Sequence, residues 1–283
     1  MISYSQLGKY GATGNQMFQY AALVGLSIKT GYTIKIPQPP NESIVSGKLV
    51  IHGHNDNHHP IETVEYALGC FSIECDYLTH QDQPQWRYEE PFFHFDSNYF
   101  NIPDNTDIMG YFQSEQYFIH CEQEIRKQFT PKHVFMEEAH TFLEKIKGDH
   151  PLISLHIRRY GHEQIEQQEI HPLIPMSYYE NLAQEFRSHY GSVKFVCFSD
   201  DIAWCKKHFE WDDIEFSENN SPIVDMTLMA MCDHNIVANS SFSWWGAWLN
   251  TNPNKQVIAP RGWFGPKGPK DTQDLIPVTW RTA

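Results

Sequence analysis

The stretch Leu152-Ile-Ser-Leu-His-Ile-Arg-Arg159 decides the predicted fold, because an apolar run leads directly into two adjacent arginines. Such a run is typical of a buried strand. In open α/β sheets, ligands bind in the crevice beyond the carboxyl ends of the strands, which is where Arg158 and Arg159 fall. A guanidinium group can grip a phosphate through two parallel hydrogen bonds. The stretch therefore predicts an anion site, although a strand followed by a solvated basic turn would also account for the two arginines.

Strands and helices alternate on the carboxyl side of this stretch, which predicts βαβ units and a parallel sheet. The segment Gly148-Asp-His-Pro151 is a natural boundary between two lobes. We therefore expect one lobe over residues 1–148 and a second over 149–283. The predicted strands of the second lobe are 152–157, 193–198, 235–238 and 256–259, and the predicted helices are 177–190, 202–209, 223–232 and 241–249.

The first half begins with a loop that becomes a helix near Thr13, with apolar residues at helical spacing up to a C-cap at Thr30-Gly31. Residues 38–65 are polar and are expected to form a long surface excursion. Further on, 107–112 has the pattern of a strand, and 118–129 and 131–147 have the pattern of helices.

The bulk composition indicates a globular protein that can bury the cores of two lobes within 283 residues. The net charge of −14 argues against a nucleic-acid partner, which needs a basic face. The six cysteines include no C-x-x-C pair, which favours buried, reduced thiols in an intracellular protein.

No apolar run approaches the roughly 20 residues of a membrane span. The first residues, Met1-Ile-Ser-Tyr-Ser-Gln6, carry neither the basic nor the apolar region of a signal peptide. We therefore expect a cytoplasmic protein of bacterial or viral type with no integral membrane segment; peripheral attachment to a membrane stays open.

Polar groups of a complementary kind follow three predicted strands of the second lobe. A helix N-terminus offers free N–H groups to an anion, basic side chains suit a diphosphate, and a carboxylate such as Asp225 can pair with the N1–H and amine of guanine. Helix capping would explain each serine or aspartate taken alone. Three such loops at one sheet edge favour a binding site, made of His156, Arg158 and Arg159, then Ser199, Asp200 and Asp201, then Asn239, Ser240 and Ser241.

No Asp-x-Asp sequence occurs in the chain. Nucleotide-sugar enzymes that hold a diphosphate through Mg²⁺ or Mn²⁺ commonly use such a carboxylate pair. Its absence beside Arg158-Arg159 predicts that the protein's own cations stabilise the leaving diphosphate, with no metal and no cofactor.

Sequence motifs along almost the whole chain resemble those of glycosyltransferase family 11, the α-1,2-fucosyltransferases. The segment Gly14-Asn-Gln-Met-Phe-Gln-Tyr-Ala21 resembles the family's amino-terminal motif, and His156-Ile-Arg-Arg159 resembles the arginine motif that fucosyltransferases share. The remaining similar segments, in the family's order, are Gly110-Tyr-Phe-Gln-Ser-Glu115, Phe198-Ser-Asp-Asp201, Asp225-Met226, Asn235-Ile-Val-Ala-Asn-Ser-Ser-Phe-Ser-Trp-Trp-Gly-Ala-Trp-Leu249, Ile258-Ala-Pro260 and Trp263-Phe264.

The resemblance implies a GT-B-type α/β fold, with two Rossmann-like lobes whose parallel sheets face each other across a cleft. Lobe 1–148 would lie on the acceptor side and lobe 149–283 would bind GDP-fucose, the donor. The implied reaction inverts the anomeric centre and moves L-fucose from GDP-β-L-fucose to O2 of galactose in an oligosaccharide or glycolipid. The donor-binding residues that the resemblance implies are Asn15, Gln16, His156, Arg158, Arg159, Ser199, Asp200, Asp225, Asn239, Ser240, Ser241 and Phe242, with the β-phosphate on Arg158.

One departure from the family pattern concerns the general base. Family members read His-x-Arg-Arg-Gly-Asp-Tyr, whereas Gly161 occupies the aspartate position here. Glu163 and Glu166 are the nearby candidates for deprotonating the acceptor, and a solvated loop face is the alternative interpretation of both. Together with Arg158 they form the predicted catalytic set.

Other signals leave alternatives open. The run His52–His59 fits no ligand spacing, although a metal-dependent transferase would use it. Trp244, Trp245 and Trp248 have the spacing of a helix core, and the aromatic segment 92–95 would line an acceptor groove or cover the first lobe. Three rival functions remain: a fucosyltransferase with another linkage or acceptor, a non-catalytic protein that binds a sugar nucleotide or glycan, and a metal-dependent transferase that uses the histidine run.

Overall fold

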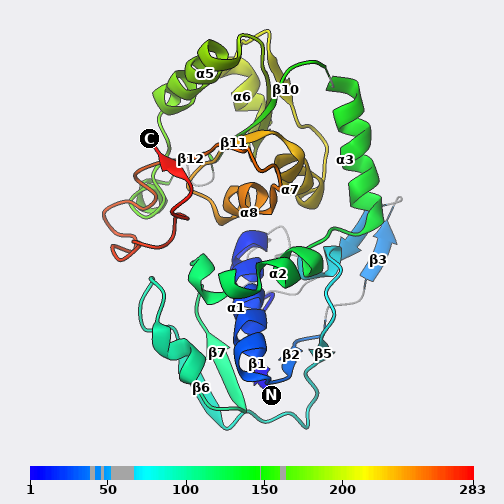
Figure 1. The fold of residues 1–283 in the computed structure, drawn as a ribbon, viewed down its shortest axis with the longest axis vertical. Helices are drawn as coiled ribbons and strands as arrows, with labels where there is room; N and C mark the ends of the chain where they lie inside the picture. Colours follow the sequence, from blue (N-terminus) through cyan, green and yellow to red (C-terminus); the bar gives the residue numbers. More distant parts are fainter. Residues whose placement is uncertain (39–41, 46–47, 52–66, 147, 160–163) are drawn as a thin grey trace. The chain divides into compact units, whose positions relative to one another are not determined.

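The computed structural model describes residues 1–38, 42–45, 48–51, 67–146, 148–159 and 164–283. The chain divides into two compact units, which are considered separately. Unit 1 comprises Met1–Lys132 and Asp271–Pro277, and unit 2 comprises His133–Lys270 and Val278–Ala283 (Figure 1).

Unit 1 is built on a five-stranded sheet in the order β5-β2-β1-β7-β6, and every pairing in it is parallel. The strands are β1 (Ile2–Ser3), β2 (Ile34–Ile36), β5 (Asp76–Tyr77), β6 (Trp86–Glu89) and β7 (Thr106–Met109), and β3 (Glu42–Val45) with β4 (Lys48–Ile51) forms an antiparallel pair. The helices are α1 (Thr13–Thr30), η1 (Ala67–Cys70), η2 (Ser97–Asn101), η3 (Glu115–Tyr117), η4 (Ile119–Cys121) and α2 (Glu122–Gln128).

Helix α1 is the core element of unit 1, because its residues from 16 to 26 are buried continuously. Gly25 lets the helix pack directly on the backbone beyond β7: a Cβ at this position would lie 2.0 Å from the carbonyl oxygen of Tyr117. The helix ends at Gly31, whose left-handed φ of 77° allows its N–H to donate to the Ser27 carbonyl. The predicted C-cap at Thr30-Gly31 is confirmed.

Unit 2 is a six-stranded parallel sheet in the order β10-β9-β8-β11-β12-β13, covered by helices. The strands are β8 (Leu152–Ile157), β9 (Lys194–Ser199), β10 (Ile214–Phe216), β11 (His234–Ile236), β12 (Val257–Ala259) and β13 (Arg281–Thr282). The helices are α3 (His133–Ile146), α4 (Ile165–Gln168), α5 (Met176–Tyr190), α6 (Ile202–His208), α7 (Pro222–Met231) and α8 (Ser241–Leu249).

The apolar cores explain why these segments form strands and helices. Residues of β8, β9, α5 and α6 form one buried cluster in unit 2, and α3 and α8 pack on α7. The three tryptophans of α8 are buried against one another: Trp244 and Trp248 stack in parallel with centroids 6.2 Å apart. Their interpretation as core residues is therefore confirmed.

Two parallel sheets, one in each unit, confirm the predicted α/β class with two Rossmann-like lobes. The predicted cleft between the lobes stays a prediction. The predicted boundary at 148/149 differs from the observed division, because α3 packs on α7 and so belongs to unit 2. Near its end the chain also returns to unit 1, where Asp274 accepts a hydrogen bond of 2.7 Å from the Phe95 N–H.

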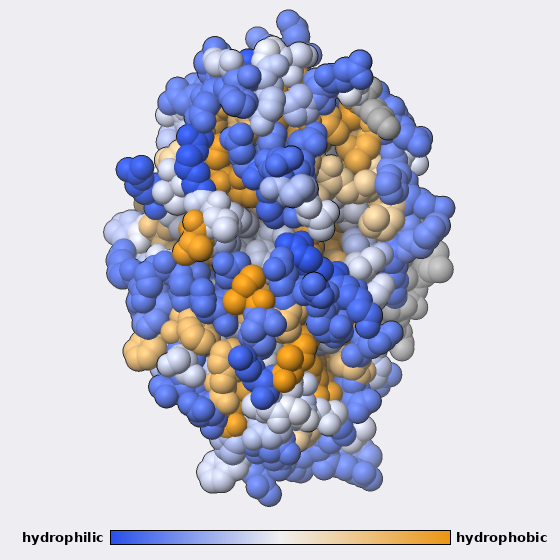
Figure 2. Space-filling view, in the orientation of Figure 1, coloured by the Kyte–Doolittle hydropathy of each residue, from blue (hydrophilic) through white to orange (hydrophobic). Residues whose placement is uncertain are grey.

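Polar side chains dominate the face shown in Figure 2, and apolar residues form small, separate patches among them. Small exposed apolar patches of this kind are common on protein surfaces and need no special explanation. Within the described ranges, no helix is both long and apolar enough to cross a membrane.

Candidate active site

The carboxyl ends of all unit 2 strands lie at one edge of the sheet, because every pairing is parallel. Strands β8, β9 and β10 extend in one direction, and β11 then pairs on the other side of β8. The strand order thus reverses between β8 and β11, and ligands of open α/β sheets bind at such a switch point. The loops that leave these two strands carry Arg158-Arg159 and Asn239-Ser240.

Arg158 and Asp200 lie side by side because the pairing of β8 with β9 ends at Ile157 opposite Ser199. Arg158 Nη1 is 3.3 Å from Asp200 Oδ2, and the backbone N–H of Arg159 donates to Asp200 Oδ1 at 2.7 Å. Asp200 therefore holds the arginine loop in place. The alternative interpretation of Asp200 is that it caps α6. That cap is instead the next residue, since Asp201 Oδ1 accepts from the Trp204 N–H at 2.9 Å.

The two arginines differ in their surroundings. The Arg159 guanidinium carbon lies 3.8 Å from the centre of the Trp204 ring, and its Nε is 3.6 Å from Asp201. Its side chain is 15% exposed, against 38% for Arg158. Arg159 is thus packed into the sheet edge, whereas Arg158 is the more accessible cation for a ligand.

His156 is buried on β8 beneath this loop, and its ring centroid lies 5.8 Å from that of Phe242 at the start of α8. Burial lowers the pKa of His156 to about 4. The charge of Asp200 acts to raise this pKa, and that of Arg158 acts to lower it. The imidazole is therefore neutral at pH 7. Among the described residues its Nδ1 has no hydrogen-bond partner, so this buried nitrogen is available to a ligand.

The N-terminus of α8 lies on the other side of the switch point. Ser240 caps the helix, since its Oγ accepts from the Phe242 N–H at 3.3 Å, and Ser241 is the first helical residue. Asn239 donates through its side-chain amide to the carbonyls of Pro172 at 2.8 Å and Trp263 at 3.1 Å. The Asn239 amide nitrogen therefore holds the neighbouring loops together, a role that the sequence did not indicate.

Asp225 on α7 reaches the end of a fourth strand, β10. Its carboxylate accepts a hydrogen bond of 2.5 Å from Ser217 Oγ, which in turn accepts one of 2.7 Å from the Asn220 side chain. Burial raises the pKa of Asp225 to about 7, against the effect of these hydrogen bonds. The sequence analysis missed Ser217 and Asn220, because the short strand before them has no clear pattern.

In unit 1, Asn15 and Gln16 lie in the first turn of α1. Gln16 is fully buried, donates to the Gly11 carbonyl at 3.2 Å and accepts from the Ala67 N–H at 3.0 Å. Asn15 Oδ1 accepts from the Gln113 side chain at 2.8 Å. The structure thus joins two motifs that are remote in the sequence, and contact of Asn15 and Gln16 with a donor stays a prediction.

Of the two predicted candidates for the general base, the structure describes only Glu166. Glu166 lies in the first turn of α4 with an exposed side chain. Glu163, the departure at Gly161 and the run His52–His59 lie outside the described residues. Within the part of the chain that is described, no group of three or more His, Cys, Asp or Glu side chains is placed to hold a metal ion.

Each of the two units contains a parallel sheet, and the unit 2 sheet carries groups that suit an anion at its switch point. These features define a fold of the GT-B glycosyltransferase type. The chain belongs to glycosyl transferase family 11, whose model matches residues 60–267.

Several known proteins are similar to this chain. It is 35% identical over 170 residues to an alpha-1,2-colitosyltransferase of Escherichia coli, over 58% of each chain. It is 28% identical over 254 residues to the galactoside 2-alpha-L-fucosyltransferase Sec1 of Mus musculus, over 84% of this chain and 62% of the relative. These alignments thus span less than two thirds of either relative.

Solved structures of POFUT1 share the fold. The apo form superposes with a TM-score of 0.53 at 11% identity, over 91% of this chain and 97% of POFUT1. The complex of POFUT1 with GDP-fucose gives a TM-score of 0.50 at 10% identity, over 90% and 95%. At such low identity the likeness concerns the fold alone.

Proposed function

We propose that this protein is a fucosyltransferase that moves L-fucose from GDP-β-L-fucose to O2 of a galactose in a glycan, with inversion and without a metal ion. One observation carries the proposal. The accessible Arg158 follows β8 at the switch point of the unit 2 sheet, and the N-terminus of α8 follows the neighbouring strand β11. Family membership supports transfer of a sugar, and the galactoside fucosyltransferases among the relatives support fucose as the donor sugar and galactose as the acceptor.

The donor would occupy the sheet edge of unit 2. Arg158 would grip the β-phosphate, and the first N–H groups of α8 would face the diphosphate. Asp225 would accept from the N1–H and amine of guanine, a pairing that uses its ionised form. The neutral, buried His156 would offer its Nδ1 to the nucleoside, since a charged imidazole is disfavoured at this site.

The transfer needs one bond to form and one to break at the anomeric carbon. The acceptor oxygen attacks C1 of fucose from the face opposite GDP, and the C1–O bond to the β-phosphate breaks with its electron pair going to the diphosphate. Arg158 stabilises the charge that develops there, and such a group contributes roughly 10²–10³ in rate.

The acceptor proton passes to a base, for which Glu166 and Glu163 remain our proposals. Fixed cations would replace a metal ion at the diphosphate, in keeping with the absence of an Asp-x-Asp sequence.

A second candidate concerns the transferred sugar. The relative with 35% identity is an alpha-1,2-colitosyltransferase, whereas the galactoside fucosyltransferase of mouse is 28% identical. Colitose is the 3-deoxy analogue of L-fucose, so the two donors differ by one hydroxyl group. The ratio of kcat/KM for the two GDP-sugars decides between them.

The test is GDP release from GDP-fucose in EDTA, with and without lactose. Lactose-dependent release that EDTA leaves undiminished, with an α-1,2-linked product by NMR, is the expected result. Loss of activity in EDTA would contradict metal independence. Tight binding of GDP-fucose, with no release of GDP in the presence of any acceptor, would instead favour the non-catalytic binding protein.

A further inference from the structure

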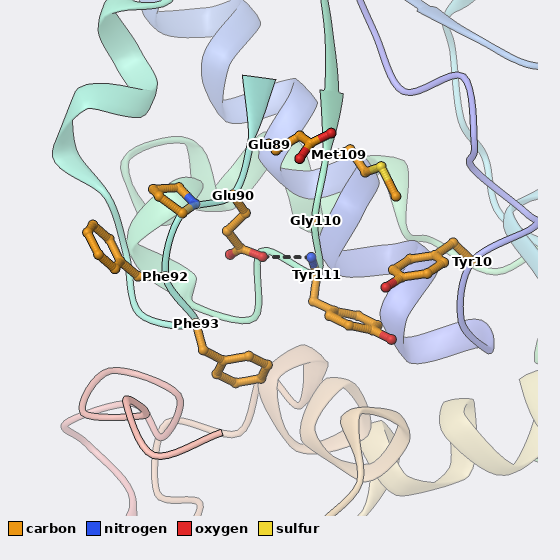
Figure 3. Close-up of a pocket in the computed structure, with 9 residues that line it drawn as sticks. Tyr10, Glu89, Glu90, Phe92, Phe93, Met109, Gly110 and Tyr111 are labelled. Carbon is orange, nitrogen blue, oxygen red and sulfur yellow. Dashed lines mark hydrogen bonds between the residues drawn. The ribbon is translucent and has the colours of Figure 1, made fainter. Parts of the chain in front are cut away.

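Unit 1 contains a pocket of about 400 Å³ that is separate from the proposed donor site and is lined in part by the aromatic segment 92–95. It lies where β6 and β7 end and where the loop before α1 passes (Figure 3). In Figure 3, Glu90 projects into the space framed by the rings of Phe92, Phe93 and Tyr111. The lining residues are Tyr10, Glu89, Glu90, Pro91, Phe92, Phe93, Met109, Gly110 and Tyr111.

The turn after β7 is shaped to form this pocket. Gly110 has a φ of 155° and Phe112 a φ of 52°, a region that side chains rarely adopt. The Glu90 carboxylate accepts from the N–H groups of Tyr111 at 2.7 Å and Phe112 at 3.0 Å, and so holds the turn. A Cβ at Gly110 would lie 2.4 Å from that of Glu90. The backbone is therefore positioned to present the Tyr111 ring beside a carboxylate.

The aromatic rim is held in place by neighbouring rings. The rings of Tyr10 and Tyr111 lie 5.0 Å apart and are tilted by 31°. Phe92 stacks on His94 at 4.8 Å, and His94 pairs with Asp271 of the segment that returns to unit 1. Tyr10 is 37% exposed and Phe92 is 51% exposed, so both rings offer accessible surface to a ligand.

The polarity of the lining indicates the class of ligand. Two of the nine lining residues are glutamates and none is Lys, Arg or His, so the lining offers no cation to a phosphate. Burial raises the pKa of Glu90 to about 7, which shows how strongly this carboxyl is desolvated. Pockets that combine apolar rings with a few polar groups suit neutral molecules with hydroxyl groups. A pyranose has this character, with an apolar C–H face and hydrogen-bonding edges.

We propose that this pocket binds the acceptor hexose, with the rings of Tyr10 and Tyr111 against its C–H face and Glu90 accepting a hydrogen bond from one of its hydroxyl groups. Phe92 forms the outer wall. The proposal rests on the proposed function, since it names where the acceptor of that reaction binds.

Exposed rings give the cleanest test, because Tyr10→Ala and Phe92→Ala remove accessible surface and leave the core intact. Glu90→Gln is less suitable as a test. Glu90 accepts hydrogen bonds from the backbone N–H groups of Tyr111 and Phe112, and the amide nitrogen of glutamine cannot accept them. Trp86→Ala is the matched control: Trp86 is 57% exposed on β6 in the same unit and does not line the pocket.

Steady-state kinetics with lactose as acceptor should separate binding from chemistry. Losing one stacked ring should raise KM for lactose roughly tenfold, with kcat within about threefold. Trp86→Ala should behave like the wild type. Isothermal titration with GDP should give the same Kd for all four proteins, because the nucleotide binds in unit 2.

Ligand-observed NMR without donor separates this proposal from the proposed function. Saturation transfer to lactose or to a methyl hexoside, lost in Tyr10→Ala, would support the pocket even if the wild type released no GDP. A wild type that transfers fucose, with KM for lactose within twofold in both pocket variants, would refute the proposal. So would absence of binding by the wild type to every methyl hexoside of a panel.

Discussion

Replacing the two adjacent arginines of unit 2 by alanine should have opposite effects: Arg159→Ala should mainly lower stability, and Arg158→Ala should mainly lower turnover. Arg159 lies 3.8 Å from the Trp204 ring centre and is mostly buried, so Arg159→Ala removes a desolvated cation–π contact worth about 1–2 kcal/mol. Its partly exposed ion pair with Asp201 adds at most about 1 kcal/mol. The free energy of unfolding should therefore fall by about 2 kcal/mol, and turnover by less than about tenfold.

Arg158→Ala should show the reverse pattern. The Arg158 side chain is 38% exposed and its Nη1 lies 3.3 Å from Asp200 Oδ2, so loss of this ion pair should lower the free energy of unfolding by at most about 1 kcal/mol. If Arg158 grips the leaving diphosphate, kcat should fall by at least roughly 10²–10³.

Urea unfolding and GDP release on the same preparations measure both effects. A double-mutant cycle of Arg159→Ala with Trp204→Leu should give a coupling free energy of about 1 kcal/mol, since the two side chains are in contact. Near-normal turnover of Arg158→Ala, or a hundredfold loss in a fully stable Arg159→Ala, would show that the roles are wrongly assigned.

Three further predictions concern packing, pH and capping. Gly25→Ala should lower the free energy of unfolding by about 1–3 kcal/mol or more, because the new Cβ would lie 2.0 Å from the Tyr117 carbonyl oxygen; a urea midpoint equal to that of the wild type would contradict this. Burial raises the pKa of Asp225 to about 7 and guanine needs the ionised form, so GDP should bind about tenfold more weakly at about pH 6 than at about pH 8 by calorimetry. Asp225→Asn should abolish that pH dependence, and a dependence that persists would assign it to another group. Ser240→Ala should cost about 1 kcal/mol in chemical unfolding through the loss of the α8 N-cap, whereas an unchanged value would mean that solvent satisfies the Phe242 N–H equally well.

The second half of the chain was readable from its sequence because its central strands are buried on both faces. Largely apolar runs such as 152–157 and 195–198 stand out against the helices between them. Strands β5, β6 and β13 were not predicted, since each is short and largely exposed and carries no regular pattern. The predicted helix 118–129 is in fact a 3₁₀ turn, η4, followed by α2.

The α/β class, the polar groups at the strand ends and the family could all be predicted from the sequence, because periodicity and motifs are local properties of the chain. The packing of α3 on α7, the contact of Arg159 with Trp204 and the hydrogen bond of Glu90 to the turn at Tyr111 became visible only in the folded chain. These contacts join residues that are distant in the sequence or depend on the direction of a side chain. A local pattern shows that a residue has an apolar face or a charge, but the partner is selected by which surfaces can be buried together when the whole chain folds.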